Sequence, residues 1–332
     1  MTKRSAVHLA SRGLAAAAAA LVLAPQAQAL TIAFDFAPGL DSYFNSNTAA
    51  LQADAIIAAK NFSSLYLNDV TLHITIQADT SAGALASSVA NFGSITDYAS
   101  IRSALVGSAS TAASMSATAA LPGTAPGSAL SDGFRVSTAE SKALGLSAAN
   151  DPTSDGTIYV GANANWNFDG MTTPGAGAYS LVGALEHEIS ELMGRTTNMS
   201  QNSWKWNSPI DLLRYTAPGV LNMSAAATGV YFSVDGGKTL GRAYNAPNNN
   251  FADVMDWASG ASADPFDAYA TSGQYLRMSL VDQQLMNTLG WRSVSTNDAV
   301  PEPATWALML VGFGMIGKTM RRRRRSSVSA AG

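Results

Sequence analysis

The chain has 332 residues, no cysteine, and a formal net charge of −3 from 23 acidic and 20 basic side chains. The basic residues gather at the two ends, because residues 30–303 keep all 23 acidic side chains but only 11 of the basic ones, a net charge of −12 (11 minus 23). An acidic body argues against nucleic acid as a partner and is compatible with cation binding, and the lack of cysteine excludes disulfides.

The first 29 residues have the three parts of a signal peptide. A basic start is followed by an apolar run over residues 13–23, and residues 27–29 read Ala-Gln-Ala, the small-x-small sequence that signal peptidase cuts. We therefore expect export, with a mature chain that begins near Leu30.

Residues 30–77 predict a strand, a helix and a second strand. Residues 30–36 alternate in part between apolar and polar side chains, and apolar residues at helical spacing predict a helix over residues 49–65. Residues 70–77 alternate most clearly, with His73 on the polar face. This order of elements predicts a sheet with a helix packed against it.

Residues 79–150 are rich in Ala, Ser and Gly, which makes their structure hard to predict. We expect a helix over residues 95–106 and a loop over residues 112–131, which contain two prolines and few large side chains. Residues 156–168 then predict a strand that leads through glycine-rich turns into the next helix.

The second half of the chain predicts short elements separated by turn residues. They fall at residues 211–215, 230–237 and 251–257, and a helix over residues 280–291 closes the body. Residues 235–237, Asp-Gly-Gly, predict a hairpin turn, with calcium binding as the less favoured alternative.

A chemically distinctive stretch, ALEHEISELMGR, lies at residues 184–195. At 100° per residue its helix has one apolar face, made of Val182, Leu185, Ile189 and Leu192. On the opposite face His187 and Glu191 stand one turn apart, and Glu188 lies to one side. This is the arrangement of H-E-x-x-H zinc helices, with a Glu in place of the second His.

A carboxylate can serve as the second ligand, because Zn²⁺ binds carboxylate oxygen and imidazole nitrogen at about the same distance. The extra negative charge makes the metal a weaker Lewis acid, and an oxygen-rich site also accepts Mn²⁺ or a similar divalent cation. In this arrangement Glu188 is the general base, which takes a proton from water and passes it to the leaving amine.

Gly194 stands seven residues after His187, and the pattern H-E-x-x-E-x-x-G resembles that of metzincin metalloproteases. The segments HEISELMGR, DLLRY, VDGG and LMNTLGW, with the signal peptide, also resemble a family of predicted metalloproteases that bear PEP-CTERM signals. The resemblance implies a zincin/metzincin-like α+β fold, a zinc cofactor, and a peptide or protein substrate bound along a strand, here over residues 159–168.

The third metal ligand is not in the position that the resemblance implies. Metzincins have His or Asp three residues past the glycine, and this chain has Thr197 there. Asp211 is our first candidate, although capping of a helix that begins at Leu212 is an equally good explanation. His73 is another candidate, but an ordinary exposed side chain is the favoured interpretation.

Three further residues have two interpretations each. Arg214 and Tyr215 can orient the Asp211 carboxylate or stabilise an oxyanion, or they can form a surface turn. Met255 can lie beneath the metal as the metzincin Met-turn does, but a methionine that fills the core is the favoured interpretation.

Residues 300–325 form the second targeting signal. A Val-Pro-Glu-Pro sequence precedes 14 uncharged residues (304–317) and then an arginine cluster at residues 321–325, which leaves residues 326–332 as a tail. This order resembles the PEP-CTERM sorting signal of Gram-negative bacteria. The resemblance implies transient anchoring by a transmembrane helix, cleavage near Pro-Glu-Pro by an exosortase-type enzyme, and release to the cell surface or matrix.

We therefore expect an exported zinc-dependent endopeptidase in one domain over residues 30–299. Its parts are a sheet lobe over about residues 30–180, the site helix over residues 181–194, and a C-terminal lobe over residues 195–299. The alternative is a non-catalytic surface or matrix protein with a degenerate metal site. A third option is an autoprocessing enzyme that acts mainly on itself or on its neighbours in the matrix.

Overall fold

A computed structural model describes residues 30–127, 133–197, 206–224, 226–247, 253–258 and 263–293. The signal peptide predicted at residues 1–29 and the sorting signal predicted at residues 300–325 lie outside these residues. The described part mixes helices and sheets, so the expected α+β class is confirmed.

Among the described residues, short elements dominate the second half of the chain, while the longest strand and the longest helix lie in the first half. The strands are β1 (Thr31–Phe36), β2 (Thr71–Asp79), β3 (Ala86–Ala90), β4 (Gly156–Gly161), β5 (Trp166–Asn167), β6 (Tyr179–Ser180), β7 (Arg214–Ala217), β8 (Val220–Leu221) and β9 (Tyr231–Phe232). The helices are α1 (Leu40–Phe44), α2 (Thr48–Leu65), α3 (Tyr98–Ser108), α4 (Ala112–Ala120), α5 (Thr138–Ala143), α6 (Leu181–Leu192) and α7 (Leu280–Thr288), with 3-10 turns η1 (Asn45–Asn47) and η3 (Pro209–Leu213).

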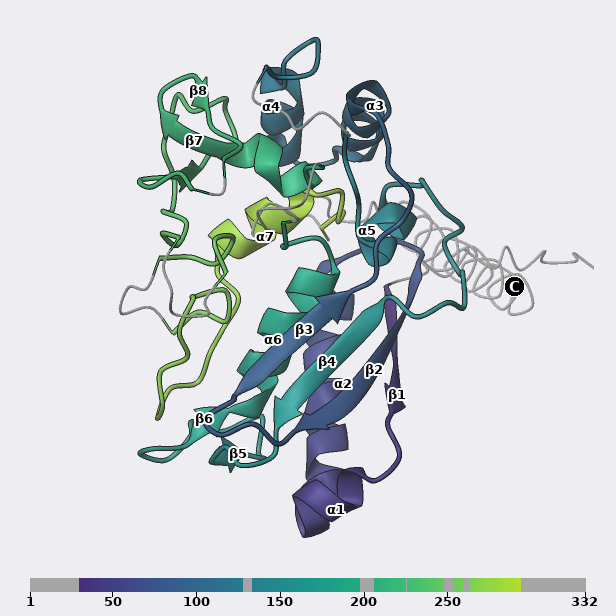
Figure 1. The fold of residues 1–332 in the computed structure, drawn as a ribbon, viewed down its shortest axis with the longest axis vertical. Coiled ribbons are helices and arrows are strands. Elements are labelled where there is room, and N and C mark those ends of the chain that lie inside the picture. The colour runs from purple at the N-terminus through teal and green to yellow at the C-terminus, as the bar shows by residue number, and fades with distance from the viewer. Residues whose placement is uncertain are drawn as a thin grey trace, which may run out of the picture.

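The largest sheet of the described residues has four strands in the order β1-β2-β4-β3. β1, β2 and β4 are parallel, and β3 runs antiparallel to β4 at one edge. The alternation predicted for β2 is confirmed, because Leu72, Ile74 and Ile76 are buried while His73 lies on the opposite, partly exposed face. Figure 1 shows α2 and α6 together on one face of this sheet, where they bury its apolar side chains.

Two predictions for the Ala/Ser/Gly-rich region are corrected by the structure. The helix predicted from residue 95 begins later, at Tyr98, because the Asp97 carboxylate caps it by accepting a hydrogen bond from the Ser100 N–H. The loop predicted over residues 112–131 was wrong for its first part, which is α4. Thr111 and Ser114 form a capping box there, and alanine has the highest helix propensity, so the helix needs few large side chains.

The strand predicted over residues 156–168 is two strands. β4 ends at Gly161, and after a turn β5 pairs with β6 in a separate two-stranded sheet. β4 also lies inside the large sheet, between β2 and β3, so it has no free edge along which a substrate can bind. The expected edge-strand role of residues 159–168 is therefore corrected: the edge strands of this sheet are β1 and β3, and β3 is the one beside β4.

The C-terminal half packs against the end of α6. The surface turn considered for Arg214 and Tyr215 is wrong, because both side chains are buried at the start of β7. Residues 235–237 form a turn, as expected, in which Asp235 accepts a hydrogen bond from the Thr239 N–H. After α7, the Trp291 indole N–H donates to the carbonyl of Met193 at 2.7 Å, which ties the end of the body to the end of α6.

Candidate metal centre

Helix α6 turns its polar face to the site because its apolar face is buried. It begins at the N-cap Ser180, whose hydroxyl accepts a hydrogen bond from the Gly183 N–H at 3.1 Å. The four apolar side chains that predicted its buried face are enclosed, and they are Val182, Leu185, Ile189 and Leu192. Gly194 ends the helix with a φ of +110°, a conformation that glycine adopts without steric cost.

His187, Glu191 and Asp256 converge at one point. Nε2 of His187 lies 3.3 Å from Oε1 of Glu191 and 3.5 Å from Oδ1 of Asp256. The three ligand atoms of this group all lie within 4.8 Å of one another. Ligands held about 2.0–2.1 Å from a tetrahedral zinc ion are separated by about 3.3–3.4 Å, so both distances from the nitrogen fit that geometry.

The second ring nitrogen of His187 fixes the direction of the first. Nδ1 lies 2.7 Å from the carbonyl oxygen of Pro265. Because a carbonyl only accepts hydrogen bonds, this contact assigns the ring proton to Nδ1 and turns Nε2 toward the two carboxylates. Metal-binding histidines commonly donate their second N–H in this way.

Each carboxylate presents one oxygen to His187, and its other oxygen accepts a hydrogen bond from another residue. Oε2 of Glu191 accepts a hydrogen bond from the Ser88 hydroxyl of β3 at 2.6 Å. Oδ2 of Asp256 accepts one from the Asp253 N–H at 3.1 Å. These contacts fix the rotation of both carboxylates.

Arg195 lies buried beneath the same group. Its Nη1 donates to Oδ1 of Asp256, and its Nη2 lies 3.6 Å from Oε1 of Glu191. Its Nε donates to the Ser190 hydroxyl at 2.7 Å, and the guanidinium carbon lies 4.7 Å from the centre of the Phe266 ring. The site thus contains a fixed positive charge that sequence analysis did not assign to it.

The charges of the site shift its acidities in different directions. Burial alone would raise the pKa of Glu191, but the hydrogen bond and charge of His187, with the charge of Arg195, lower it to about 2. Burial and Arg195 lower the pKa of His187, but the neighbouring carboxylates outweigh them and raise it to about 9. Burial and the charge of Glu191 raise the pKa of Glu188 well above its ordinary value. A bound cation therefore has to compete with a proton on His187.

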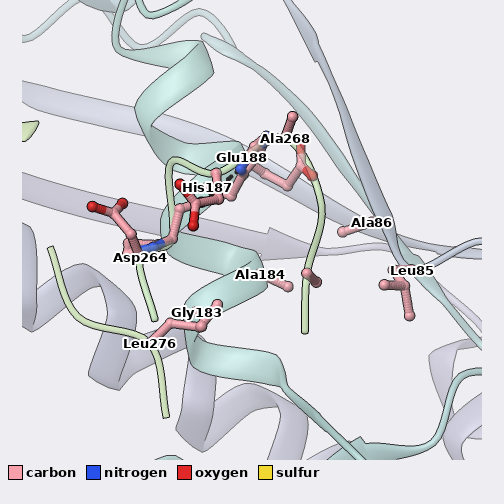
Figure 2. A pocket seen from close by; sticks show the side chains of 12 residues that line it. Leu85, Ala86, Gly183, Ala184, His187, Glu188, Asp264, Ala268 and Leu276 are labelled. Carbon is pink, nitrogen blue, oxygen red and sulfur yellow. Dashed lines mark hydrogen bonds between the residues drawn. The ribbon is translucent and has the colours of Figure 1, made fainter. Parts of the chain in front are cut away.

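A pocket opens beside His187 and Glu188 (Figure 2). Its volume of about 130 Å³ is close to that of cavities that admit one benzene molecule, so it can take a single side chain of medium size. Leu85 and Ala86 line one side and Ala184 of α6 another, with the loop before α7 completing the wall (Figure 2). Glu188 thus lies where the group of ligands meets a space for substrate.

Asp211 is not brought into the group with His187. It is fully buried, and its carboxylate accepts hydrogen bonds from the Ser208 N–H, the Thr197 hydroxyl and the Asn207 amide. Ser208 and Asp211 form a capping box on η3, so Asp211 has a capping role, but in a 3-10 turn that begins at Pro209 and not in a helix that begins at Leu212. Thr197, at the position of the third metzincin ligand, therefore contacts Asp211 rather than the site.

The third member, Asp256, was missed although its neighbour was noted. Met255 is buried, which fits the interpretation as core filler, and the next residue carries the carboxylate. The sequence feature that could have identified Asp256 is its position as the acidic residue directly after Met255, in the stretch VMDW. His73 is not a member of the group, and its backbone N–H donates to Asp155.

Comparison with known proteins bears on the C-terminal end. The PEP-CTERM protein-sorting motif matches residues 299–325. The chain therefore carries a PEP-CTERM sorting signal. The motif implies export, membrane anchoring or sorting at the C-terminus, and recognition by an exosortase-type sorting enzyme. No curated protein and no solved structure matches the chain. Across the described ranges, no helix has the length and apolar character needed to cross a membrane.

Proposed function

We propose that this protein is an exported metallopeptidase in which His187, Glu191 and Asp256 hold a zinc-type cation. The observation that supports the proposal is the separation of 3.3 and 3.5 Å between Nε2 of His187 and the two carboxylate oxygens, beside a pocket that contains Glu188. Sorting by the C-terminal signal would then deliver the enzyme to the cell surface or the extracellular matrix.

The roles of the residues follow from their positions. When bound, a zinc-type cation would polarise a water molecule and the carbonyl of the scissile bond. Glu188 would take the proton of that water and pass it to the leaving amine, because it lines the pocket beside His187. The Pro265 carbonyl keeps His187 in the orientation that this chemistry needs.

The substrate that fits best is an extended peptide. β3 is one of the two edge strands of the large sheet, and Ser88 within it contacts Glu191. An exposed edge can pair with an added strand, and the pocket beside Ala86 then receives one of the peptide's side chains. An edge strand beside the site helix is also what the metzincin resemblance implies, which supports a zincin-like fold as part of the proposal.

Arg195 favours a second candidate function. Its guanidinium offsets one of the two carboxylate charges, so the group can stand as a buried ion-pair network that only stabilises α6. The protein would then be a non-catalytic surface or matrix protein, with its sorting signal intact.

Metal content separates the two candidates. The full chain, with His187→Ala, Glu191→Ala and Asp256→Ala beside it, is analysed for bound metal after incubation with zinc or manganese and removal of the excess. One equivalent in the wild type, lost in all three variants, supports the metallopeptidase. Cleavage of an unstructured protein substrate, abolished by a chelator and restored by zinc, then tests the activity. A wild type that binds no metal leaves the non-catalytic function.

A further inference from the structure

We propose that Arg195 makes the site selective for zinc over cations that seek many oxygen ligands, such as Mn²⁺ and Ca²⁺. The inference rests on the proposed metal site and assigns a residue that determines which metal it holds. Arg195 would not bind the metal, so it is a positioning residue that acts through Glu191 and Asp256.

The ligand set by itself is weakly selective. One imidazole and two carboxylates suit zinc, but carboxylates are also the preferred ligands of manganese and calcium. Calcium takes six to eight oxygens and often binds carboxylates through both oxygens. An exported protein whose two carboxylates could each rotate to give both oxygens would therefore bind such ions readily.

Rotation of the carboxylates is blocked from the outer side. Oε2 of Glu191 is held by the Ser88 hydroxyl at 2.6 Å, and Oδ2 of Asp256 is held by the Asp253 N–H at 3.1 Å. The oxygen that faces His187 is therefore the one that each carboxylate offers most readily to a cation.

Arg195 reduces the capacity of those two remaining oxygens to bind a cation. Oδ1 of Asp256 accepts a hydrogen bond from Nη1, and Oε1 of Glu191 lies 3.6 Å from Nη2. A guanidinium that shares both oxygens occupies part of their lone-pair capacity and offsets one negative charge. The guanidinium has no contact with Nε2 of His187. The nitrogen therefore contributes a larger share of the cation's binding energy relative to the two oxygens, and this favours zinc.

The guanidinium is held rigidly in this position. Nε donates to the Ser190 hydroxyl, Nη2 donates to the His187 carbonyl at 3.3 Å, and the Phe266 ring covers one of its faces. The reversal of the chain at Gly194 brings Arg195 back beneath its own helix, where its N–H donates to the Ser190 carbonyl at 3.0 Å. A charge fixed by so many contacts cannot move away when a cation enters.

The test compares metal affinities of the full chain with those of Arg195→Gln, which removes the charge, and Arg195→Lys, which keeps it. Dissociation constants for Zn²⁺ are measured by competition with a chromophoric chelator, and those for Mn²⁺ and Ca²⁺ by calorimetry. We expect the preference for zinc over manganese to fall by about tenfold or more in Arg195→Gln, and calcium binding to strengthen. Arg195→Lys keeps the charge but loses the fork of donors that reaches both oxygens, so its preference for zinc should fall between those of the wild type and Arg195→Gln.

Other results overturn the inference or its basis. A parallel loss of affinity for all three ions in both variants would give Arg195 a structural role only. A wild type that binds none of the ions removes the proposed metal site itself. If Arg195→Gln does not fold, Arg195→Met keeps the stem packed on Phe266, and Phe266→Leu loosens the guanidinium without removing it. Either should weaken the preference for zinc, and an unchanged preference in both would overturn the inference.

Discussion

Nδ1 of His187 and the carbonyl oxygen of Pro265 lie 2.7 Å apart, although 78 positions separate the two residues in the sequence. A similar long-range contact joins Arg195 to Asp256, 61 positions later. The segment beyond β9 therefore supplies both the third member of the group, Asp256, and the carbonyl that orients the histidine. The helix motif and this segment form one site only in the folded protein.

Glu188→Gln should retain bound metal and lose activity. The amide has nearly the shape of the carboxyl but cannot accept the proton of water, so the rate of peptide cleavage should fall by about 100-fold or more. Metal content and the cleavage rate are measured on the same preparation. Loss of metal in this variant would show that Glu188 has another role.

Glu186→Gln is the matched control for that experiment. Glu186 lies on the same helix and is equally buried, but its Oε1 accepts a hydrogen bond from the Asn61 amide at 2.5 Å and it does not line the pocket. Both activity and metal content should stay close to wild type. A loss of activity as large as that of Glu188→Gln would mean that buried glutamates of α6 act through stability alone.

Asp256→Asn and Asp211→Asn distinguish the third ligand. We expect Asp256→Asn to weaken zinc binding by more than about 100-fold, since it neutralises a ligand. Asp211→Asn should leave zinc affinity unchanged, because its carboxylate caps η3. Circular dichroism checks that both variants fold, which matters for Asp256 because its loss leaves Arg195 with the more distant Glu191 carboxylate as its ion-pair partner. The reverse pattern would restore Asp211 as the ligand.

The fold was predictable where side-chain periodicity was strong. β2 and the apolar face of α6 were predicted because large apolar residues repeat at regular intervals. α4 and β3 were not, because their residues are mainly Ala and Ser, which give neither a helical nor an alternating pattern of large side chains. Capping by Thr111 determines where α4 begins, and pairing with β4 determines β3.

The site was half predictable for a related reason. His187 and Glu191 belong to one helix, so their spacing in sequence fixes their spacing in space. Asp256 and Arg195 reach them through chain reversals that no local pattern encodes. Asp211 was an attractive candidate because an acidic residue in an apolar stretch is unusual, but a capping role satisfies it equally well.

Gly194→Ala should destabilise the protein by about 2–3 kcal/mol. Its φ of +110° strains any residue that has a Cβ, and a Cβ built there would lie 2.7 Å from the carboxyl of the buried Glu140. Gly175→Ala is the control, because a Cβ on Gly175 meets nothing within 4 Å. Urea unfolding of both variants measures the difference, and equal stability would contradict the role of Gly194 in ending α6.

Asp54→Asn should change how stability depends on pH. Asp54 lies on α2 with 2% of its surface exposed, and burial, with the charge of Asp169, raises its pKa from 3.8 to about 6 in spite of a hydrogen bond from the Gly170 N–H. Between pH 3.8 and 6 the folded state holds more protons than the unfolded state, so this group's contribution to stability falls as the pH rises and is constant above that range.

The variant has no such group, so its unfolding free energy relative to the wild type should rise by about 2 kcal/mol between pH 4 and pH 7. Urea unfolding at several pH values measures this difference. Asp41→Asn, an exposed position on α1, is the control and should follow the wild-type curve closely. Parallel curves for Asp54→Asn and the wild type would show that the folded protein does not hold the proton on Asp54, and that the carboxylate is stabilised by its contact with Gly170.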